Sequence, residues 1–250
     1  MQNELIDGIV YETRNGYEYA VASCEEGIEN AVISLTLNGL PVIGIEMEAF
    51  KDRTSLKTVD FIDYPDIVDA FMNGFYVAGE SFSGCTALTE MILPSFCNFI
   101  GRSAFRGCTS LVRVEMMEGC YVAPYAFYRC SSLTDVTPLL SVDEGVFSHC
   151  SALASFPVSE GAGEICEDAF EHCDALTDII IPKSVKRIER LAFRGCRGLK
   201  SVTFEDTDGW YSHNCYTDGE CPIDVTDSHG NAAALSGMDF DDGITAWYKK

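Results

Sequence analysis

The chain of 250 residues carries 39 acidic and 17 basic residues, a formal net charge of −22, and its pI is about 4.3. Such a surface argues against nucleic acid, whose phosphates require clusters of Lys and Arg, and against electrostatic docking on anionic lipid. Because 47% of the residues are hydrophobic, with 15 Phe and 11 Tyr, the chain can bury a substantial core and is not expected to be disordered.

No targeting or spanning segment is expected in this sequence. None of its apolar runs approaches the roughly 18 residues that a membrane-spanning helix needs. The opening stretch, MQNELIDGIVYE, lacks the basic region and apolar stretch of a signal peptide. We therefore expect no membrane insertion, and either an intracellular protein or one from which a leader has been trimmed.

Residues 1–41 have the pattern of an N-terminal β-hairpin cap. The stretch IVYETRNGYEYAVAS alternates apolar and polar residues on either side of Asn15-Gly16, a pair typical of a type I′ hairpin turn. A second such pair, Asn38-Gly39, leads into the next apolar run. An open stack of repeats would expose apolar side chains and unpaired strand edges, so a cap is expected here.

From residue 42 to residue 206 the chain repeats itself. The phrase AFRGC occurs at Ala104–Cys108 and again at Ala192–Cys196, and it belongs to a longer pattern, Phe-x-x-Cys-x-x-Leu. Six copies follow this pattern and a seventh has Arg in place of Cys: Phe82-Cys85-Leu88, Phe105-Cys108-Leu111, Phe127-Cys130-Leu133, Phe147-Cys150-Leu153, Phe170-Cys173-Leu176, Phe193-Cys196-Leu199 and Phe50-Arg53-Leu56. Successive phenylalanines are 32, 23, 22, 20, 23 and 23 residues apart, and the long first interval indicates an insertion within 63–76.

Two further columns recur around each copy. Five residues before each Phe stands Ile or Val, and after each Leu comes an apolar-x-apolar pair such as Val114/Met116 or Phe156/Val158. The alternation predicts a short strand, and the spacing of Phe, Cys and Leu predicts one or two helical turns with one buried side. Such a unit cannot bury both of its faces alone. Seven copies stacked at ~4.8 Å per coil would form a solenoid roughly 30 Å long.

The repeat resembles the leucine-rich repeats of the treponemal or BspA-like type. The segments IERLAFRGCRGLKSVTF (Ile188–Phe204) and ICEDAFEHCDALTDIIIP (Ile165–Pro182) match that family's pattern closely. The resemblance implies an α/β solenoid, that is, a right-handed leucine-rich-repeat superhelix of about seven coils over residues 42–206. It also implies a surface-exposed or secreted bacterial interaction protein. The sequence has no Walker loop, GxSxG, HExxH or GxGxxG motif, so we expect neither an enzyme nor a cofactor. The chain departs from the pattern at Arg53, at the insertion and in the short interval from Phe127 to Phe147.

Residues 207–250 are predicted to form a C-terminal cap. The segment DSHGNAAAL has the pattern of a short capped helix, and six residues supply apolar anchors: Trp210, Tyr211, Val225, Leu235, Trp247 and Tyr248. The cap also contains His213, Cys215, Cys221 and His229, whose spacing fits no common zinc pattern. Loop residues without a shared role are the favoured interpretation. A Cys215–Cys221 disulfide in an oxidising compartment and a zinc site stay open.

The repeat cysteines and the acidic clusters each allow more than one interpretation. Adjacent coils would bring the cysteines within disulfide distance, but with all side chains pointing into one core. Since Cys packs as a small hydrophobe, we predict buried free thiols, with disulfides or metal as alternatives. His149 and His172 precede two of these thiols and are expected to face solvent. The clusters at Glu205–Gly209 and Asp239–Gly243 lack a full calcium-binding loop and are predicted to be solvated.

Together these features predict a non-catalytic, adhesin-like protein-binding module that uses the concave strand face of the solenoid. The candidate contact residues are the outward-pointing Ile92, Arg113, Glu115, Asp135 and Ile180, with four aromatic residues of the insertion, Tyr64, Phe71, Phe75 and Tyr76. The expected partner is a protein, such as a host extracellular protein. The alternatives are a metal-binding or enzymatic protein that acts through the C-terminal Cys/His group, and a purely structural surface component. The sequence does not identify the partner, the oligomeric state or the role of the insertion.

Overall fold

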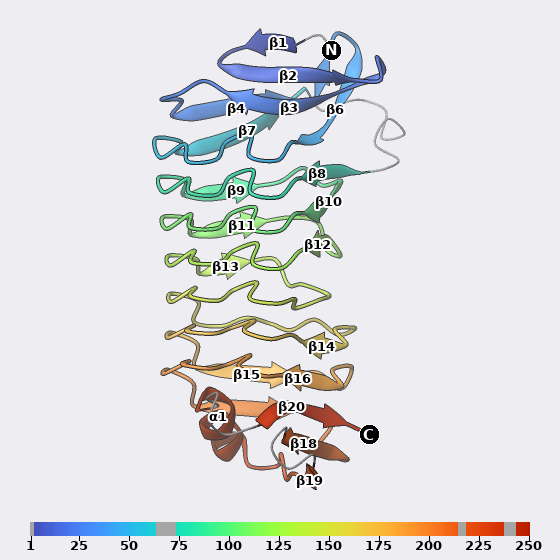
Figure 1. The fold of residues 1–250 in the computed structure, drawn as a ribbon, viewed down its shortest axis with the longest axis vertical. Coiled ribbons are helices and arrows are strands. Elements are labelled where there is room, and N and C mark those ends of the chain that lie inside the picture. Colours follow the sequence, from blue (N-terminus) through green and yellow to red (C-terminus); the bar gives the residue numbers. More distant parts are fainter. Residues whose placement is uncertain (1–2, 64–73, 215–218, 238–243) are drawn as a thin grey trace.

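The protein is a single column of stacked coils with the two ends of the chain at opposite ends of the stack (Figure 1). The structure, a computed structural model, describes residues 3–63, 74–214, 219–237 and 244–250. It contains about eight turns and little helix. The predicted solenoid is thereby confirmed, whereas its right-handedness and the concavity of its strand face stay predictions.

Two columns of short strands run along the stack. The post-Leu strands are those that follow the repeat leucines, together with β4 (Asn30–Ser34), which pairs with the first of them: β7 (Thr58–Ile62), β9 (Glu90–Ile92), β11 (Arg113–Glu115), β13 (Asp135–Val136), β15 (Asp178–Ile181) and β17 (Ser201–Phe204). The pre-Phe strands are those that precede the repeat phenylalanines, together with β3 (Glu18–Cys24), which pairs with the first of them: β6 (Leu40–Ile45), β8 (Phe75–Val77), β10 (Cys97–Ile100), β12 (Tyr121–Val122), β14 (Glu164–Ile165) and β16 (Arg187–Glu189). The remaining elements are β1 (Asn3–Ile6), β2 (Ile9–Arg14), β5 (Thr36–Leu37), β18 (Trp210–Asn214), β19 (Gly219–Pro222), α1 (Ser228–Ser236) and β20 (Ile244–Lys249).

The repeat phenylalanines form a continuous stack through the centre of the molecule. All seven are fully buried: Phe50, Phe82, Phe105, Phe127, Phe147, Phe170 and Phe193. Neighbouring rings lie 4.8 to 5.7 Å apart between centroids, and their planes are within 20° of parallel. Burying each ring contributes about 1.5–3 kcal/mol. The core predicted from the repeat is confirmed.

The repeat cysteines are buried free thiols, as predicted, and they also bind the coils together. Each thiol donates a hydrogen bond of 2.9 to 3.2 Å from Sγ to the carbonyl oxygen of the Phe on the preceding coil, from Cys85 with Phe50 through to Cys196 with Phe170. The same carbonyl already accepts a backbone N–H three residues ahead in its own coil, as in Cys85 N to Phe82 O. Burial raises the pKa of these thiols, to about 12 for Cys196. They are therefore unreactive core groups.

The segment around each Phe is a pair of tight turns and not the predicted helical turn. In every coil the residues two before and two after the Phe have positive φ, between 55° and 77°, as at Tyr125 and Arg129 around Phe127. A left-handed residue every fourth position interrupts any helix. The freed N–H groups instead bond to the next coil, for example Tyr125 N to Glu144 O and Phe127 N to Val146 O. We call this column of turns, from three residues before each Phe to two after it, the turn column.

The stack begins one turn earlier than the repeat pattern indicated. Strand β3 pairs in parallel with β6, and β4 pairs in parallel with β7, so residues in the predicted cap already form a turn of the solenoid. The count of seven coils was therefore too low, because this first turn has no Phe-x-x-Cys-x-x-Leu motif. The hairpin predicted at Asn15-Gly16 is present between β2 and β3, with both turn residues at positive φ.

Arg53 links the first Phe-containing coil to this earlier turn. The turn before this coil has no repeat Phe, so a cysteine at position 53 would have no Phe carbonyl to which its thiol could donate. Arg has a longer side chain and reaches a different acceptor. Its Nη2 group donates to the carbonyl oxygen of Cys24 at 3.3 Å. The departure from the cysteine column is thus explained by the position of the coil at the end of the stack.

One predicted strand does not form. Residues 155–158, which contain the pair Phe156/Val158, have no strand, and the post-Leu sheet is interrupted between β13 and β15. Pro157 stands at the outward position of this segment and lacks the N–H that a ladder requires. Phe156 and Val158 nevertheless remain buried.

The C-terminal end of the stack is covered by β20 and α1. Strand β20 pairs antiparallel with β16, and the predicted helix α1 begins after the N-cap residue Asp227. The buried Asn231 donates its side-chain amide to the carbonyl oxygen of Val202, at 3.1 Å, and Ser236 O accepts the N–H of Gly195. Backbone groups of the last coil that would lack partners are satisfied in this way.

We expect the repeat thiols to resist labelling in the native protein. A maleimide reagent should modify the exposed Cys221 first and the half-buried Cys166 more slowly, because thiolate formation at the repeat cysteines requires opening of the core. Labelling sites are read by mass spectrometry, with urea-unfolded protein as the control in which all twelve cysteines react. Rapid native labelling of Cys130 or Cys150 would contradict the stacked core.

Phe127→Ala in a middle coil should lower the free energy of unfolding by about 3–5 kcal/mol, because it empties a buried aromatic site. The matched control is Tyr121→Ala, since the Tyr121 side chain is 45% exposed and its loss should cost about 1 kcal/mol or less. Urea unfolding followed by circular dichroism measures both changes. Equal effects of the two substitutions would show that Phe127 is not part of the core.

Candidate protein-binding face

The outward residues of the post-Leu strands form a regular lattice, which we call the strand face. Register pairing places Arg113 of β11 beside Glu90 of β9 and Asp135 of β13. One step along the same strands, Glu115 lies beside Ile92. The structure therefore brings Ile92, Arg113, Glu115 and Asp135 together, as the alternating sequence pattern predicted.

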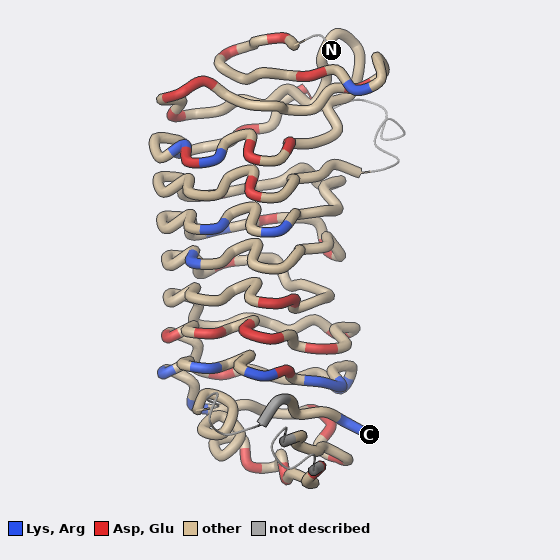
Figure 2. Tube along the Cα trace, in the orientation of Figure 1, with Lys and Arg blue, Asp and Glu red and all other residues tan. Residues whose placement is uncertain are grey.

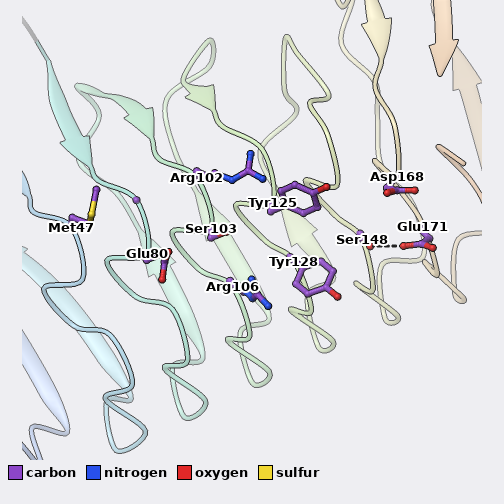
Figure 3. Close-up of a pocket in the computed structure, with 11 residues that line it drawn as sticks. Met47, Glu80, Arg102, Ser103, Arg106, Tyr125, Tyr128, Ser148, Asp168 and Glu171 are labelled. Atoms are coloured by element: carbon purple, nitrogen blue, oxygen red, sulfur yellow. Dashed lines mark hydrogen bonds between the residues drawn. The ribbon is translucent and has the colours of Figure 1, made fainter. Parts of the chain in front are cut away.

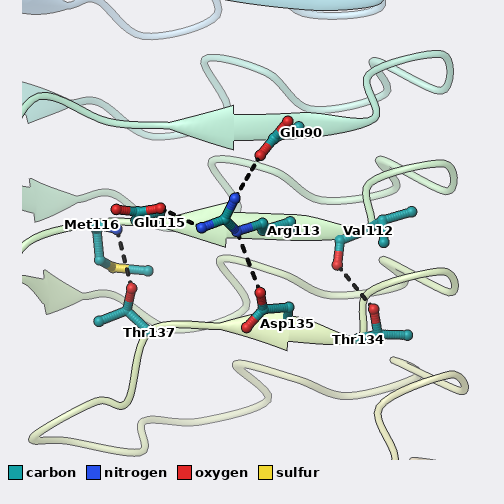
Figure 4. Close-up of polar contacts among 8 residues, drawn as sticks. All are labelled: Glu90, Val112, Arg113, Glu115, Met116, Thr134, Asp135 and Thr137. Atoms are coloured by element: carbon teal, nitrogen blue, oxygen red, sulfur yellow. Dashed lines mark hydrogen bonds and ion pairs between the residues drawn. The ribbon is translucent and has the colours of Figure 1, made fainter.

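Arg113 is the centre of an exposed ion-pair cluster on this face (Figure 4). Its guanidinium lies 3.1 Å from Glu90 Oε1, 2.5 Å from Glu115 Oε2 and 3.3 Å from Asp135 Oδ2. Three carboxylates against one guanidinium leave a net charge of −2. Arg113 is consequently already neutralised by its neighbours, and the surface offers carboxylate oxygens to a ligand.

Apolar side chains interrupt the acidic lattice at two places. Ile92 is 46% exposed and borders a hollow of about 260 Å³ between β7 and β9, which Asp60 and Glu90 also line. Ile180 is 58% exposed and borders a second hollow of about 560 Å³, beside Pro157, where the sheet is interrupted. Four coils of ~4.8 Å separate the two hollows. Ile180 therefore lies outside the group formed by Ile92, Arg113, Glu115 and Asp135, which we call the Ile92–Arg113 patch.

The aromatic residues assigned to the insertion have different positions. Tyr64 and Phe71 lie outside the described residues. Phe75 is fully buried in β8, edge-on to Phe61 and Phe96, so its assignment as a partner contact was wrong. It belongs to the core because β8 begins at Phe75, inside the range 63–76. Tyr76 is half-buried and donates its hydroxyl to Glu46, and burial together with this carboxylate raises the pKa of its phenol.

A row of aromatic side chains that the sequence analysis missed crosses the pre-Phe strands. Tyr76, Phe99 and Tyr121 are in register on β8, β10 and β12. Phe99 is 38% and Tyr121 45% exposed, and their rings stack with centroids 5.8 Å apart. The signal was present, since each stands directly before the Ile or Val of the repeat, at an outward position of the strand.

The C-terminal Cys/His group is not assembled among the described residues. His213 lies on β18, Cys221 on the neighbouring β19 and His229 in α1, while Cys215 falls outside the part of the chain that the structure describes. Within that part, no three His, Cys, Asp or Glu side chains converge as a metal site would require. Zinc and a Cys215–Cys221 disulfide therefore stay untested.

The sequence profile of the BspA type leucine-rich repeat region matches the chain in six copies, over residues 29–137, 70–173 and 124–218. The chain belongs to this family. No curated protein sequence matches it. Among the described residues, no helix is both long and apolar enough to cross a membrane.

Solved bacterial structures share the fold. A leucine-rich repeat protein of T. pallidum, TpLRR, is 22% identical with a TM-score of 0.54, over 82% of this chain and 84% of its own. A leucine-rich repeat protein of Bacteroides ovatus is 21% identical, also with a TM-score of 0.54, over 82% of this chain and 71% of its own. A leucine-rich cell surface protein of Faecalibacterium prausnitzii is 19% identical with the same TM-score. This chain covers 59% of that protein's length, and 86% of this chain is aligned.

Arg113→Gln should lower the free energy of unfolding by about 1 kcal/mol or less, because exposed ion pairs are screened and contribute little. The remaining Glu90, Glu115 and Asp135 then repel one another, so the difference from wild type should shrink as salt is raised. Urea unfolding at low and high ionic strength measures this. A loss above about 2 kcal/mol that persists in high salt would show that Arg113 has a packing role instead.

Proposed function

We propose that the protein is a non-catalytic, adhesin-like binding module that acts at the cell surface or after secretion, with a host extracellular protein as its partner. Membership of the BspA-type repeat family supports a protein-interaction or surface role. The F. prausnitzii relative is a cell surface protein, which supports the location.

The single observation that carries the proposal is the Ile92–Arg113 patch. It combines exposed carboxylates, fixed in a lattice by strand register, with an exposed aliphatic side chain beside a hollow. Binding sites typically pair a small apolar anchor with a polar rim. The chemistry fits a partner that presents Lys or Arg around an apolar residue, and the net charge of −22 would steer such a partner toward the protein at low salt.

The other functions considered have weaker support. A metal-dependent or enzymatic role would have to arise at the C-terminal Cys/His group, part of which lies outside the described residues. A purely structural surface component would need no ligand at all. The experiment that follows distinguishes binding on the strand face from both.

Ile92→Lys should weaken binding of a basic extracellular partner about tenfold or more, because it removes the apolar contact and adds repulsion. Leu140→Lys is the matched control, since Leu140 is 44% exposed but lies outside the strand rows. Purified extracellular matrix proteins are tested in turn for binding to the immobilised chain by surface plasmon resonance. The proposal fails if none binds, or if both variants bind the identified partner as wild type does.

A further inference from the structure

The turn column carries a groove, which is lined by side chains other than those of the strand face (Figure 3). Its volume is about 550 Å³, and it extends across successive coils from Met47 to Glu171. Arg102 and Arg106 project from the Phe105 coil, Tyr125 and Tyr128 from the next, and Asp168 and Glu171 from the Phe170 coil (Figure 3). Beyond Met47 and Glu80, whose carboxylate already pairs with Lys51, the groove has a basic part, an aromatic part and an acidic part in that order.

The basic part is formed by Arg102 and Arg106, which have no carboxylate partner among the described residues. The Arg102 guanidinium lies 4.7 Å from the centre of the Tyr125 ring, and that of Arg106 lies 5.1 Å from the centre of the Tyr128 ring, which Arg129, outside the groove lining, also approaches to 5.1 Å. Among the described residues none of these three arginines forms an ion pair, although the chain has 39 acidic and 17 basic residues. Stacking on a ring orients a guanidinium and leaves its N–H edges available to an anion.

This basic part is unusual within the charge distribution of the molecule. Acidic residues occur along the stack, while seven of the 17 basic residues fall between Lys183 and Lys200, on and around the coil of β16 (Figure 2). There, Arg190 pairs with Glu167 and Arg194 with Glu171. Arg102 and Arg106 thus lie apart from this basic coil, and they contact tyrosine rings but form no ion pair with the described residues.

The acidic part contains a carboxylate oxygen that lacks a partner. Asp168 Oδ1 is buried and forms no hydrogen bond. Burial, together with the neighbouring carboxylates of Glu171, Glu167 and Glu144, raises the pKa of Asp168 to about 6, against the lowering effect of Arg190. Glu171 is already held by Ser148, which donates to Oε2 at 3.1 Å, and by Arg194. A cationic group entering the groove would satisfy Asp168.

The aromatic rings of the groove are held in place because they pack against small residues of the neighbouring coil. Tyr125 lies across Gly145 of the next coil, where a Cβ atom would stand 2.3 Å from the Tyr125 ring. Gly145 itself has a φ of 57°, and the Tyr125 hydroxyl donates to Glu144 at 2.6 Å. Ser103 and Ser148, both buried, complete the lining. The ring positions are therefore built into the stack.

We propose that this groove binds an extended peptide segment of a protein partner, with an acidic side chain on Arg102 and Arg106 and a Lys or Arg on Asp168. Three coils of ~4.8 Å separate the two parts, about 14 Å, which an extended chain spans in about four residues at ~3.4 Å each. A sulfated glycan would meet the arginines equally well but would be repelled by Asp168 and Glu171. The site is independent of the strand face, so either site can fail in its test without the other.

The test uses fluorescein-labelled Ser-Glu-Glu-Thr-Ser-Lys-Lys-Ser, in which each Glu precedes a Lys by four residues, and the same peptide with Glu and Lys exchanged. Analogues replace both Glu, both Lys or all four by Gln. Fluorescence anisotropy at low ionic strength measures their affinities for the full chain. Of the two peptides that contain both Glu and Lys (the mixed peptides), one should bind more tightly than the other. Each Gln analogue of that tighter peptide should bind about tenfold more weakly than the peptide itself.

Variants of the groove assign each charge to its partner. In the Arg102→Gln/Arg106→Gln variant, the affinity advantage of Glu over Gln in the peptide should vanish. In the Asp168→Asn variant, the affinity advantage of Lys over Gln should vanish. Arg197→Gln is the control and should keep both, because Arg197 is exposed and lies outside both the groove lining and the strand face. The proposal is overturned if the mixed peptides bind no better than the all-Gln peptide, if the groove variants keep both advantages, or if a heparin oligosaccharide binds more tightly through the same arginines.

A stability measurement checks the acidic part without any ligand. Because the folded-state pKa of Asp168 is raised to about 6, its stabilising contribution is complete below the ordinary pKa of an Asp, near 4, and is lost as pH rises through 6. Asp168→Asn should therefore melt at a higher temperature than wild type at pH 8 and at the same temperature at pH 4. Equal melting at pH 8 would show that Asp168 is solvated and would remove the argument for a cation there.

Discussion

The stack depends on how the carbonyl group of each repeat phenylalanine is satisfied. This oxygen is buried beside the Phe ring, where an unpaired acceptor would be costly. In the six coils that another repeat coil follows, it accepts one N–H from its own coil and one thiol from the next coil, as Phe105 O does from Cys108 N and Cys130 Sγ. The cysteine is small enough for the core and still supplies a donor, which Ala could not do. The spacing from Phe to Cys is therefore held constant, and with it the registration of every coil on its neighbour.

Much of this architecture could be predicted from the residues alone. The recurrence of Phe, Cys and Leu identified the coils, their buried column and the outward rows, because burial of one face follows from periodicity. The left-handed turns on either side of each Phe could not be predicted, since Tyr125, Arg129 and His149 adopt positive φ to serve carbonyls more than fifteen residues away. The first turn, formed by β3 and β4, was not predicted because it lacks the repeat motif. It is recognised only from the pairing of these strands with β6 and β7.

The candidate sites show the same limit. Sequence alternation placed Arg113, Glu115 and Ile92 on one surface, but only the register of three strands shows that Arg113 is surrounded by carboxylates. Phe75 was misassigned because a buried aromatic residue and an exposed one look alike beside an insertion, whereas the in-register row of Phe99 and Tyr121 is visible once strand order is known. Surfaces assembled from many coils are properties of the stack, and single repeats do not reveal them.

The direction of the hydrogen bonds in the turn column makes the two ends of the stack chemically different. In every repeat coil but the last, the N–H groups of the Phe and of the residues two before and two after it bond to the coil that follows, as in Phe82 N to Ala104 O and Gly107 N to Tyr128 O. A stack without its caps would therefore offer a row of donors at its C-terminal end and a matching row of acceptors at its N-terminal end. Two such ends fit each other, which is the geometry of an open, head-to-tail filament. At the C-terminal end the carbonyl oxygen of Ser236 accepts one of these donors, Gly195 N, so the cap occupies part of the edge to which a further coil would add.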